Sequence, residues 1–379
     1  MSNESAVDFE MIDKGLKSGN AVPLSWYYDA DISDYETAMF ERAWQYAGHI
    51  GQLSEPGQFV TFTVGRVPMI VVRNRQGELR AFRNVCRHRS AEVVVEPCGT
   101  RRMLQCHYHA WTYDLDGRLV GAPRSDREAE FDKTELSLIP ASVDTWGPFV
   151  FVNLDVECSS LEEALGDVPD LIRAAGVDVD TLVFNRRSEY DMDCNWKISI
   201  ENYLECYHCP GAHPGFSRVL DTNADAYRIS AEKTHAHQIA PLRPSPATVD
   251  TGGYTGRDGV VNSGTYIVVW PSLTINVNPG LQNLSIGPML PVPGAINKSH
   301  AYLDYFFGAE VTEEWIDDMF VFDNRVAEED QELIESVQRG VDSRTLETAQ
   351  VLPTSESLLL GFQRYLVDQH KNTDTRNGR

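Results

Sequence analysis

The chain has 379 residues, of which 42% are hydrophobic and 23% charged, enough for two domain cores. Its formal net charge of −23 argues against binding to nucleic acid or anionic membranes and favours cationic ligands or basic partners. No stretch approaches the roughly 18 apolar residues of a membrane span, and no signal peptide is recognisable, so we expect a cytoplasmic protein. Seven cysteines in such a chain favour metal or redox chemistry over a disulfide framework.

The first third of the chain predicts one helix followed by short strands. Residues Ser33–Glu36 have the pattern of a capping box, and helically spaced apolar positions continue from there to Ala47. From Gln58 to Leu154 the chain consists of short β-rich runs, which predict a small all-β domain. Asp116-Gly117 indicates a hairpin. The clearest runs are 59–64, 69–74, 79–82, 101–106 and 149–154.

The remainder of the chain predicts an α+β domain, because helical patterns accompany long strands that follow one another. A strong helix is expected from Glu313 to Arg339, with Thr312 as N-cap and Gly340 as the stop. A last helix is expected over Ser355–His370. The clearest strands, at 265–270, 273–278 and 300–307, predict an antiparallel sheet.

The most specific motif combines two cysteines and two histidines. Cys86 and His88 form one half, and Cys106 and His109 form the other, each after a β run. A structural zinc site is usually built from a Cys-Cys half and a His-His half, whereas each half here mixes one thiolate with one imidazole. That mixture suits a Rieske-type [2Fe–2S] cluster, in which imidazoles replace thiolates on one iron and raise the potential. A structural zinc knuckle is the alternative interpretation.

Four other residues near these motifs are not expected to be ligands. Cys98 lacks a partner at ligand spacing, so we predict that it is a buried hydrophobic residue. His107 is expected to be exposed near the cluster or held by packing. Cys206 and Cys209 are expected to pack inside the protein rather than to act chemically.

A second constellation lies in the segment at 195–216. His208 and His213 are separated by Pro210, so a helix that starts near Trp196 would end near Cys209. The two imidazoles would then come from the helix end and the turn that follows it. Two histidines and one carboxylate form the facial triad of non-haem Fe(II) enzymes.

The predicted helix at 313–339 offers the carboxylate. Asp330 lies within its apolar stripe, where a charge is costly unless it is paired or bound to a metal. Asp323, two turns earlier, lies on nearly the same face. Periodicity alone leaves both residues as candidates.

These motifs together resemble the catalytic (alpha) subunits of Rieske non-haem iron oxygenases. The segments CRHRSAEV and LQCHYHAWTYDLDGRLVG are similar to the Rieske domain of that family, and the elements NWK, ENY, the histidine pair and EEDQELIESVQRG follow in the family's order. The resemblance implies an all-β Rieske domain and a helix-grip antiparallel-sheet catalytic domain. It also implies that Asp330 is the third iron ligand.

The resemblance further implies the cofactors and partners. We expect a [2Fe–2S] cluster, a mononuclear Fe(II), O₂ as co-substrate, and electrons from NAD(P)H through a separate flavin/ferredoxin-type reductase. Glu205 matches the acidic bridge between one subunit's iron and the cluster of the next subunit in a homotrimer. The expected parts are an N-terminal segment packed on the catalytic domain, the Rieske domain, the catalytic domain and a disordered tail, at 1–45, 46–156, 157–370 and 371–379.

The substrate is less constrained. The ENYLECYHC stretch around Glu205 is similar to carnitine and glycine betaine monooxygenases, which implies a small quaternary ammonium substrate. Aromatic side chains in the second domain can cage such a cation; they are Tyr203, Tyr207, Tyr266, Trp270, Tyr302, Tyr305, Phe306 and Phe307.

Three other interpretations compete with this one. An aromatic acid or ring is the alternative substrate, and an acid would need a pocket cation such as Arg228, Lys233 or Arg243. A simple electron carrier would not need the second iron site. A structural zinc protein would contain stoichiometric zinc and no cluster.

Overall fold

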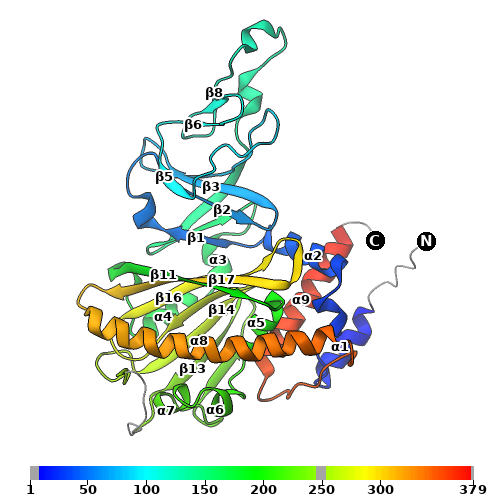
Figure 1. The fold of residues 1–379 in the computed structure, drawn as a ribbon, viewed down its shortest axis with the longest axis vertical. Helices are drawn as coiled ribbons and strands as arrows, with labels where there is room; N and C mark the ends of the chain where they lie inside the picture. Colours follow the sequence, from blue (N-terminus) through cyan, green and yellow to red (C-terminus); the bar gives the residue numbers. More distant parts are fainter. Residues whose placement is uncertain (1–7, 245–252, 377–379) are drawn as a thin grey trace. The chain divides into compact units, whose positions relative to one another are not determined.

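The computed structural model describes residues 8–244 and 253–376 and divides the chain into two compact units (Figure 1). One unit is formed by residues Thr37–Ala164. The other combines the chain up to Glu36 with the chain from Leu165 onward, so it is discontinuous in sequence. No described helix is both long and apolar enough to cross a lipid bilayer.

The unit at 37–164 is an all-β structure. Its main antiparallel sheet has the order β1-β10-β9-β4-β3-β2-β5, and a small sheet has the order β6-β7-β8. β-branched and aromatic residues form these strands because such side chains pack well on a pleated surface. The strands are β1 (Gln45–His49), β2 (Gln58–Val64), β3 (Val67–Arg73), β4 (Leu79–Arg83), β5 (Cys98–Thr100), β6 (Leu104–Gln105), β7 (Thr112–Tyr113), β8 (Leu119–Gly121), β9 (Pro140–Trp146) and β10 (Phe149–Asn153).

The core of this unit includes two of the predicted ligands. Ile70 and Val72 of β3 are fully buried and belong to the same apolar cluster as Cys86 and Cys106. Removing this apolar surface from water stabilises the unit. The same packing therefore anchors both ligand loops.

The second unit is built on an antiparallel sheet in the order β11-β17-β16-β15-β14-β13-β12. β11 is an edge strand of this sheet, and β17 pairs with β11 on one side and with β16 on the other. The strands are β11 (Leu182–Met192), β12 (Arg228–Ala231), β13 (His235–Pro241), β14 (Ser263–Val269), β15 (Leu273–Val277), β16 (Asn283–Val292) and β17 (Ala295–Gly308). The helices in or bordering this unit are α1 (Phe9–Lys17), α2 (Ala30–Phe40), α3 (Leu161–Leu165), α4 (Val168–Ala174), α5 (Trp196–Tyr203), α6 (Cys209–Ala212), α7 (Phe216–Val219), α8 (Glu313–Asp342) and α9 (Ser357–Arg376).

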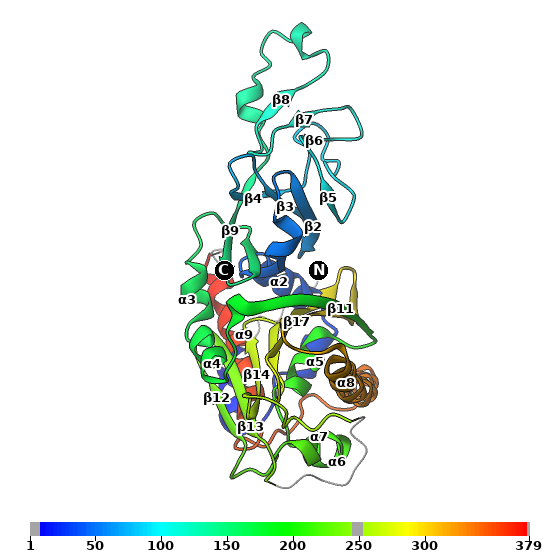
Figure 2. The ribbon, with the colours of Figure 1, turned by 90° about the vertical axis from the view of Figure 1, so that its left-hand side faces the viewer.

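Helix α8 lies along one face of this sheet (Figures 1 and 2). Its N-cap is Thr312, whose side chain accepts a hydrogen bond from the backbone amide of Trp315. The helix buries Met319 and Phe320 toward the sheet. Thr312 was the predicted N-cap, and this prediction is confirmed. The helix continues past Gly340 to Asp342, because a glycine weakens a helix by only about 1 kcal/mol and does not by itself end it.

A buried polar network joins the N-terminal segment to α5. Lys197 Nζ lies 2.6 Å from Glu36 Oε1, and the indole of Trp196 donates to Glu36 Oε2 at 2.9 Å. The hydroxyl of Tyr27 donates to Glu201 at 2.6 Å. Lys197 is fully buried, and Glu36 is nearly so. The N-terminal segment thus packs on the helix that precedes the histidine pair.

We predict that Lys197→Met will lower the free energy of unfolding by roughly 3–5 kcal/mol, because it leaves the buried Glu36 carboxylate without its cation. Denaturant unfolding followed by circular dichroism measures this effect. The double variant Lys197→Met/Glu36→Gln should recover most of the loss. Equal stability of wild type and single variant would contradict the prediction.

Two predicted elements differ from the structure. The predicted helix from Ser33 to Ala47 is wrong at both ends, because α2 spans Ala30–Phe40 and Ala47 lies in β1. The predicted disordered tail at 371–379 is also wrong in part, because α9 continues to Arg376. Lys371 Nζ pairs with Asp13 at 2.6 Å, which ties this end of α9 to α1. Residues 377–379 lie outside the described part of the chain.

Two candidate metal centres

Two loops of the all-β unit share one backbone design. In the first, the amide of Ser90 donates to the carbonyl of Cys86 at 3.0 Å, and in the second Ala110 donates to Cys106 at the same distance. Ser90 and Ala110 both have a φ of 57°, in the left-handed region that costs energy for residues other than glycine. The same strained turn therefore presents both halves of the motif.

The four predicted cluster ligands separate by chemistry. Cys86 and Cys106 are buried, and their thiols interact with one another. Burial raises the pKa of the Cys106 thiol. His88 and His109 are exposed, with ring centroids 4.5 Å apart, and Trp111 stacks on His88. The two thiols therefore lie together in the interior, and the two imidazoles lie together at the surface.

This arrangement fits a [2Fe–2S] cluster, whose two irons carry different ligands. A structural zinc ion would instead draw all four donors around one centre. In the described chain, the three donors that converge within 4.8 Å are His208, His213 and Asp330, and not the cysteine–histidine set. The donor geometry therefore favours the cluster over the zinc knuckle.

Other predictions near this motif have mixed outcomes. Cys98 is exposed in β5, so the prediction of a buried residue is wrong. The reason is that β5 is a short edge strand, which pairs with β2 on one side. His107 is exposed, in agreement with one of the two placements expected for it.

Tyr113 contacts one of the predicted cluster ligands. Its hydroxyl lies 3.4 Å from Cys86 Sγ and accepts the amide of Arg87 at 3.0 Å. Burial raises the pKa of Tyr113, so its proton stays available for the sulfur. Hydrogen bonds to cluster sulfurs raise the reduction potential.

We expect Tyr113→Phe to lower the cluster's reduction potential by roughly 40 mV, the one-electron equivalent of a hydrogen bond worth about 1 kcal/mol. Spectroelectrochemistry of the reconstituted protein gives this value. Tyr108→Phe is the matched control, because that hydroxyl binds Arg89 and no sulfur ligand. An unchanged potential in Tyr113→Phe would show that the contact does not tune the cluster.

The predicted iron histidines flank a short helix of the second unit. α5 ends at Tyr203, with Leu204 as its C-cap, so the prediction that it reaches Cys209 is wrong. A new helix, α6, starts at Cys209, because Pro210 is favoured in a first helical turn and not in a helix interior. His208 and His213 are the N-cap and C-cap of α6.

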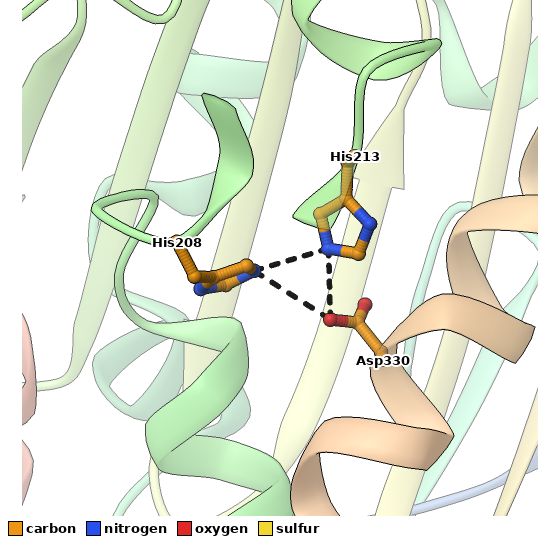
Figure 3. A group of neighbouring side chains, drawn as sticks. All are labelled: His208, His213 and Asp330. Carbon is orange, nitrogen blue, oxygen red and sulfur yellow. Dashed lines mark hydrogen bonds and ion pairs between the residues drawn. The ribbon is translucent and has the colours of Figure 1, made fainter. Parts of the chain in front are cut away.

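Both imidazoles turn their Nε2 atoms toward Asp330 of α8 (Figure 3). The two Nε2 atoms are 3.1 Å apart, and Asp330 Oδ1 lies 3.0 Å from His213 and 3.5 Å from His208. Metal–ligand bonds of about 2.1 Å at right angles separate neighbouring donors by roughly 3.0 Å. The triangle therefore has the size of one face of a metal site. Asp323 does not reach the imidazoles, and accepts a hydrogen bond from Asn278 at 2.9 Å.

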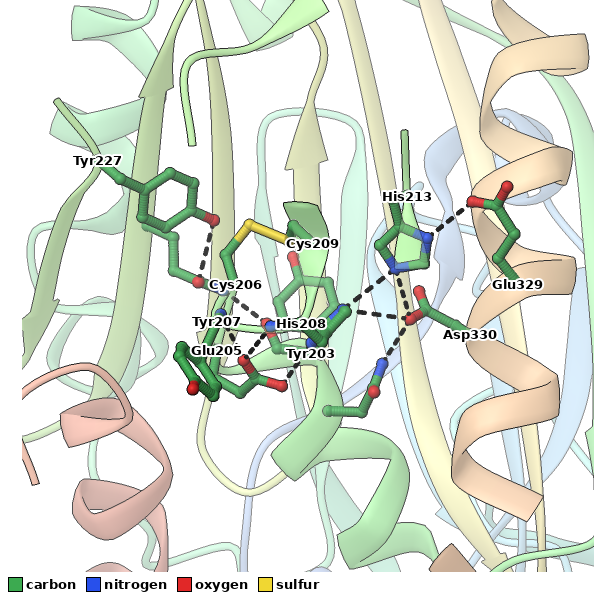
Figure 4. A network of polar contacts seen from close by, with 12 residues as sticks. Tyr203, Glu205, Cys206, Tyr207, His208, Cys209, His213, Tyr227, Glu329 and Asp330 are labelled. Atoms are coloured by element: carbon green, nitrogen blue, oxygen red, sulfur yellow. Dashed lines mark hydrogen bonds and ion pairs between the residues drawn. A yellow bond between two sulfur atoms is a disulfide. The ribbon is translucent and has the colours of Figure 1, made fainter. Parts of the chain in front are cut away.

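Carboxylates hold the outer nitrogen of each imidazole (Figure 4). Nδ1 of His208 contacts Glu205 Oε1, and Nδ1 of His213 lies 2.8 Å from Glu329 Oε2. Such partners keep the proton on Nδ1 and leave the Nε2 lone pair for a metal. The carboxylate–imidazole pairs are typical of histidine ligands.

Two residues of this site were missed by sequence reasoning. Glu329, directly before Asp330, holds His213, and Asn202 Nδ2 donates to Asp330 Oδ1 at 2.7 Å. The position of Glu329 beside a candidate ligand was a signal, but charged neighbours are common on helices. Asn202 belongs to the ENY element, whose role could not be read from spacing.

The carboxylates of the site favour positive charge on the imidazoles. Burial lowers the pKa of His208, but hydrogen bonds to Asp330 and Glu205 outweigh burial and raise this pKa to about 9. Burial raises the pKa of Asp330, but hydrogen bonds from His208 and His213 lower it to about 2. A divalent cation held by neutral imidazoles would supply the same charge. The donor set therefore fits a mononuclear Fe(II).

The loop between α5 and α6 is closed by two local interactions. Glu205 Oε2 accepts the amides of Tyr207 at 2.5 Å and His208 at 3.1 Å, so Glu205 lies in a turn rather than on a helix. Cys206 and Cys209 form a disulfide with a Cα–Cα distance of 4.9 Å. The prediction that both cysteines only pack is therefore wrong, because the turn brings them within bridging distance.

A cavity of about 220 Å³ adjoins the triad. Its acidic lining groups are Glu205, Asp323 and Asp330, and its described lining includes no lysine or arginine. Amides of Gln238, Asn276 and Asn278 add polar surface. The aromatic lining residues are Tyr190, Tyr203, Phe216, Tyr227, Tyr266, Tyr302, Tyr305 and Phe322.

Several predicted pocket residues lie elsewhere. Tyr207 is 65% exposed, and Trp270 stacks on Phe362. Arg243 hydrogen-bonds the backbone of Ser217 and does not line the cavity. The other candidate pocket residues that lie outside the described lining are Arg228, Lys233, Phe306 and Phe307.

Family comparisons agree with this architecture. Residues 179–372 match the family "Ring hydroxylating alpha subunit (catalytic domain)", and residues 43–141 match the Rieske [2Fe-2S] domain. The carnitine monooxygenase oxygenase subunit of Acinetobacter pittii is 30% identical over 358 residues, covering 92% of this chain and 94% of that protein. The chloroplastic choline monooxygenase of Amaranthus tricolor is 31% identical, covering 86% of this chain and 72% of that protein.

Solved structures extend the comparison. The quaternary ammonium Rieske monooxygenase CntA aligns with a TM-score of 0.82 at 28% identity, covering 95% of this chain and 98% of that chain. Naphthalene 1,2-dioxygenase from Rhodococcus sp. aligns with a TM-score of 0.78 at 20% identity, covering 97% and 98%, which shows a shared fold. The predicted α+β class, with a Rieske domain and a catalytic domain, is confirmed. The chain is an oxidoreductase that belongs to the Rieske non-haem iron oxygenase alpha subunits, in the subgroup that resembles carnitine monooxygenase.

Proposed function

We propose that this chain is the terminal component of a multicomponent oxygenase that oxidises a small quaternary ammonium compound. The observation that carries the proposal is the cavity beside the triad, whose described lining combines tyrosine faces and carboxylates without a lysine or arginine. Each contact of an onium group with an aromatic face contributes roughly 0.5–2 kcal/mol. Relatives named carnitine and choline monooxygenase support the same substrate class.

An aromatic acid is the alternative substrate, and the cavity disfavours it. An aromatic acid carries no positive charge of its own, so its carboxylate would face Glu205, Asp323 and Asp330 without a neighbouring cation. Burying an anion without a partner is costly. An uncharged ring would fit the aromatic walls but would not use the acidic groups.

The proposed ligand sets follow from the donors at each centre. Cys86, His88, Cys106 and His109 hold the [2Fe–2S] cluster, in the domain at 46–156. The three residues of the triad, His208, His213 and Asp330, hold Fe(II), in the domain at 157–370. When bound, these groups supply one-electron transfer and O₂ activation.

The protein's own residues then act by binding, orienting and shielding. Glu205 and Glu329 fix the imidazole tautomers, and Asn202 orients the Asp330 carboxylate. The tyrosine walls hold the substrate against the triad and limit the access of water. We propose monooxygenation. One oxygen atom of O₂ enters a C–H bond of the substrate, and the other takes up two electrons and two protons and leaves as water.

We propose a homotrimer and a separate NAD(P)H-dependent flavin/ferredoxin-type reductase as partners. The structure of CntA gives insight into inter-subunit electron transfer in that protein, which supports an assembly in which subunits share electrons. A head-to-tail ring would supply every iron site with a neighbouring cluster. A cytoplasmic location agrees with the use of NAD(P)H as electron source.

A single-turnover experiment tests the proposed function without the native reductase. Protein loaded with cluster and iron is reduced with dithionite, freed of excess reductant, and exposed to O₂ with choline, carnitine, glycine betaine or benzoate. Mass spectrometry should detect up to about one product per iron site from an ammonium compound and none from benzoate. His213→Ala is the matched control, with no product expected. Product from benzoate alone would overturn the proposal.

A further inference from the structure

Of the acidic residues that line the cavity, Asp323 is the one that does not contact the imidazoles of the triad. It lies on α8 two helical turns before Asp330, roughly 10 Å along the helix axis. Asp323 lines the cavity and keeps part of its surface accessible there, although it lies in the interior of the unit. A ligand can therefore reach Asp323 and the triad at the same time.

The surroundings of Asp323 leave its charge uncompensated. Its carboxylate accepts a hydrogen bond from Asn278 Nδ2 at 2.9 Å and one from the hydroxyl of Tyr305. In the described chain no lysine, arginine or histidine forms an ion pair with it. A buried carboxylate whose two partners are neutral lowers the stability of the protein unless a cation pairs with it.

The groups that face Asp323 stay neutral near physiological pH. Burial raises the pKa of Asp323 itself to about 7. Burial also raises the pKa of each tyrosine whose hydroxyl interacts with this carboxylate electrostatically, from β11, α5, β14, β17 and the segment before β14. These residues are Tyr190, Tyr203, Tyr254, Tyr266 and Tyr305. Asp323 is thus the only member of this group that ionises between pH 6 and pH 8.

We propose that Asp323 is the onium-binding carboxylate of the cavity and selects a quaternary ammonium cation as substrate. The inference rests on the proposed function and adds the residue that recognises the charge. The aromatic rings around the carboxylate enclose the methyl groups, and Asp323 pairs with the positive charge. The roughly 10 Å along α8 to Asp330 places the far end of a choline-sized molecule at the triad.

Anaerobic calorimetry on the protein loaded with cluster and iron tests the inference. The probes are choline and 3,3-dimethylbutan-1-ol, which has the same shape and no charge. Asp323→Asn should weaken choline binding roughly tenfold to a hundredfold and leave the neutral alcohol unchanged within about twofold. Asp317→Asn removes the same charge from an exposed position on α8 and should bind choline as the wild type does.

The pH dependence of the wild type supplies a second measurement that needs no variant. Choline affinity should fall about tenfold from pH 8 to pH 6, because Asp323 gains a proton over that range. The alcohol should show no such change. Equal choline binding by wild type and Asp323→Asn, or choline affinity independent of pH, would overturn the inference.

The two possible failures are distinguishable. If the wild type forms product from an ammonium compound but Asp323→Asn binds choline equally well, the inference fails and the proposed function stands. If the wild type neither binds nor oxidises any ammonium compound, the proposed function fails, and the role of Asp323 fails with it.

Discussion

Asp330→Ala is expected to abolish product formation and to lower the iron content from about three to about two per chain, since the cluster keeps its two irons. The triad loses its sole carboxylate donor, and the two imidazoles alone bind a divalent ion weakly. Iron analysis and the EPR spectrum of the reduced cluster measure the two centres separately.

Asp323→Asn is the matched control for iron loading. Asp323 bonds to Asn278 and not to the imidazoles, so its variant should keep about three irons per chain. This pair of variants separates the two aspartates that helical periodicity leaves equivalent. If Asp330→Ala kept its full iron content and Asp323→Asn lost iron, Asp323 rather than Asp330 would be the third ligand.

Glu205→Ala is expected to keep both metal centres and to lower turnover by roughly 10- to 100-fold or more, the usual effect of removing a residue that orients a metal ligand. The variant deletes the carboxylate that contacts His208 Nδ1 and accepts the amides of Tyr207 and His208. Rapid mixing with O₂ would follow reoxidation of the reduced cluster by its visible absorbance. Glu205→Gln keeps the side-chain size and acts as the matched variant. Wild-type turnover in Glu205→Ala would remove the bridging assignment.

Mixed assemblies show whether electrons cross between subunits. Cys86→Ser chains lack the cluster, and Asp330→Ala chains lack the mononuclear iron, so each homotrimer should be inactive. Co-expressed chains should recover activity if the cluster of one subunit serves the iron of its neighbour. Inactive mixed trimers would instead place the electron path within one chain.

The sequence points to the cluster motif because the chemistry of that motif is local. Cys86 and His88 are close in sequence, and so are Cys106 and His109, so one turn can present each pair. The β-rich texture around them predicted the all-β unit for the same reason. Burial of the thiols and exposure of the imidazoles needed the surrounding core, which forms between strands distant in sequence.

Errors in the secondary structure arose where local signals compete with packing. Ser33 and Glu36 have the spacing of a capping box, but Glu36 is instead buried against Lys197, more than 150 residues later. The segment with Ala47 is drawn into a strand by its pairing with β10. Cys206 and Cys209 became a disulfide because a turn, and not a continuous helix, follows α5.

By itself, the sequence determined the family, the two types of metal motif and the order of the domains, because these depend on residue types at short spacings. Only the tertiary structure decided that Asp330 faces the imidazoles and that Glu329 supports His213. It also decided that Asp323 lines an aromatic cavity and has no ion-pair partner among the described residues. The physical reason is that helical periodicity specifies only which face of α8 a residue lies on. The residues that each position on that face contacts belong to strands and loops that folding brings next to the helix.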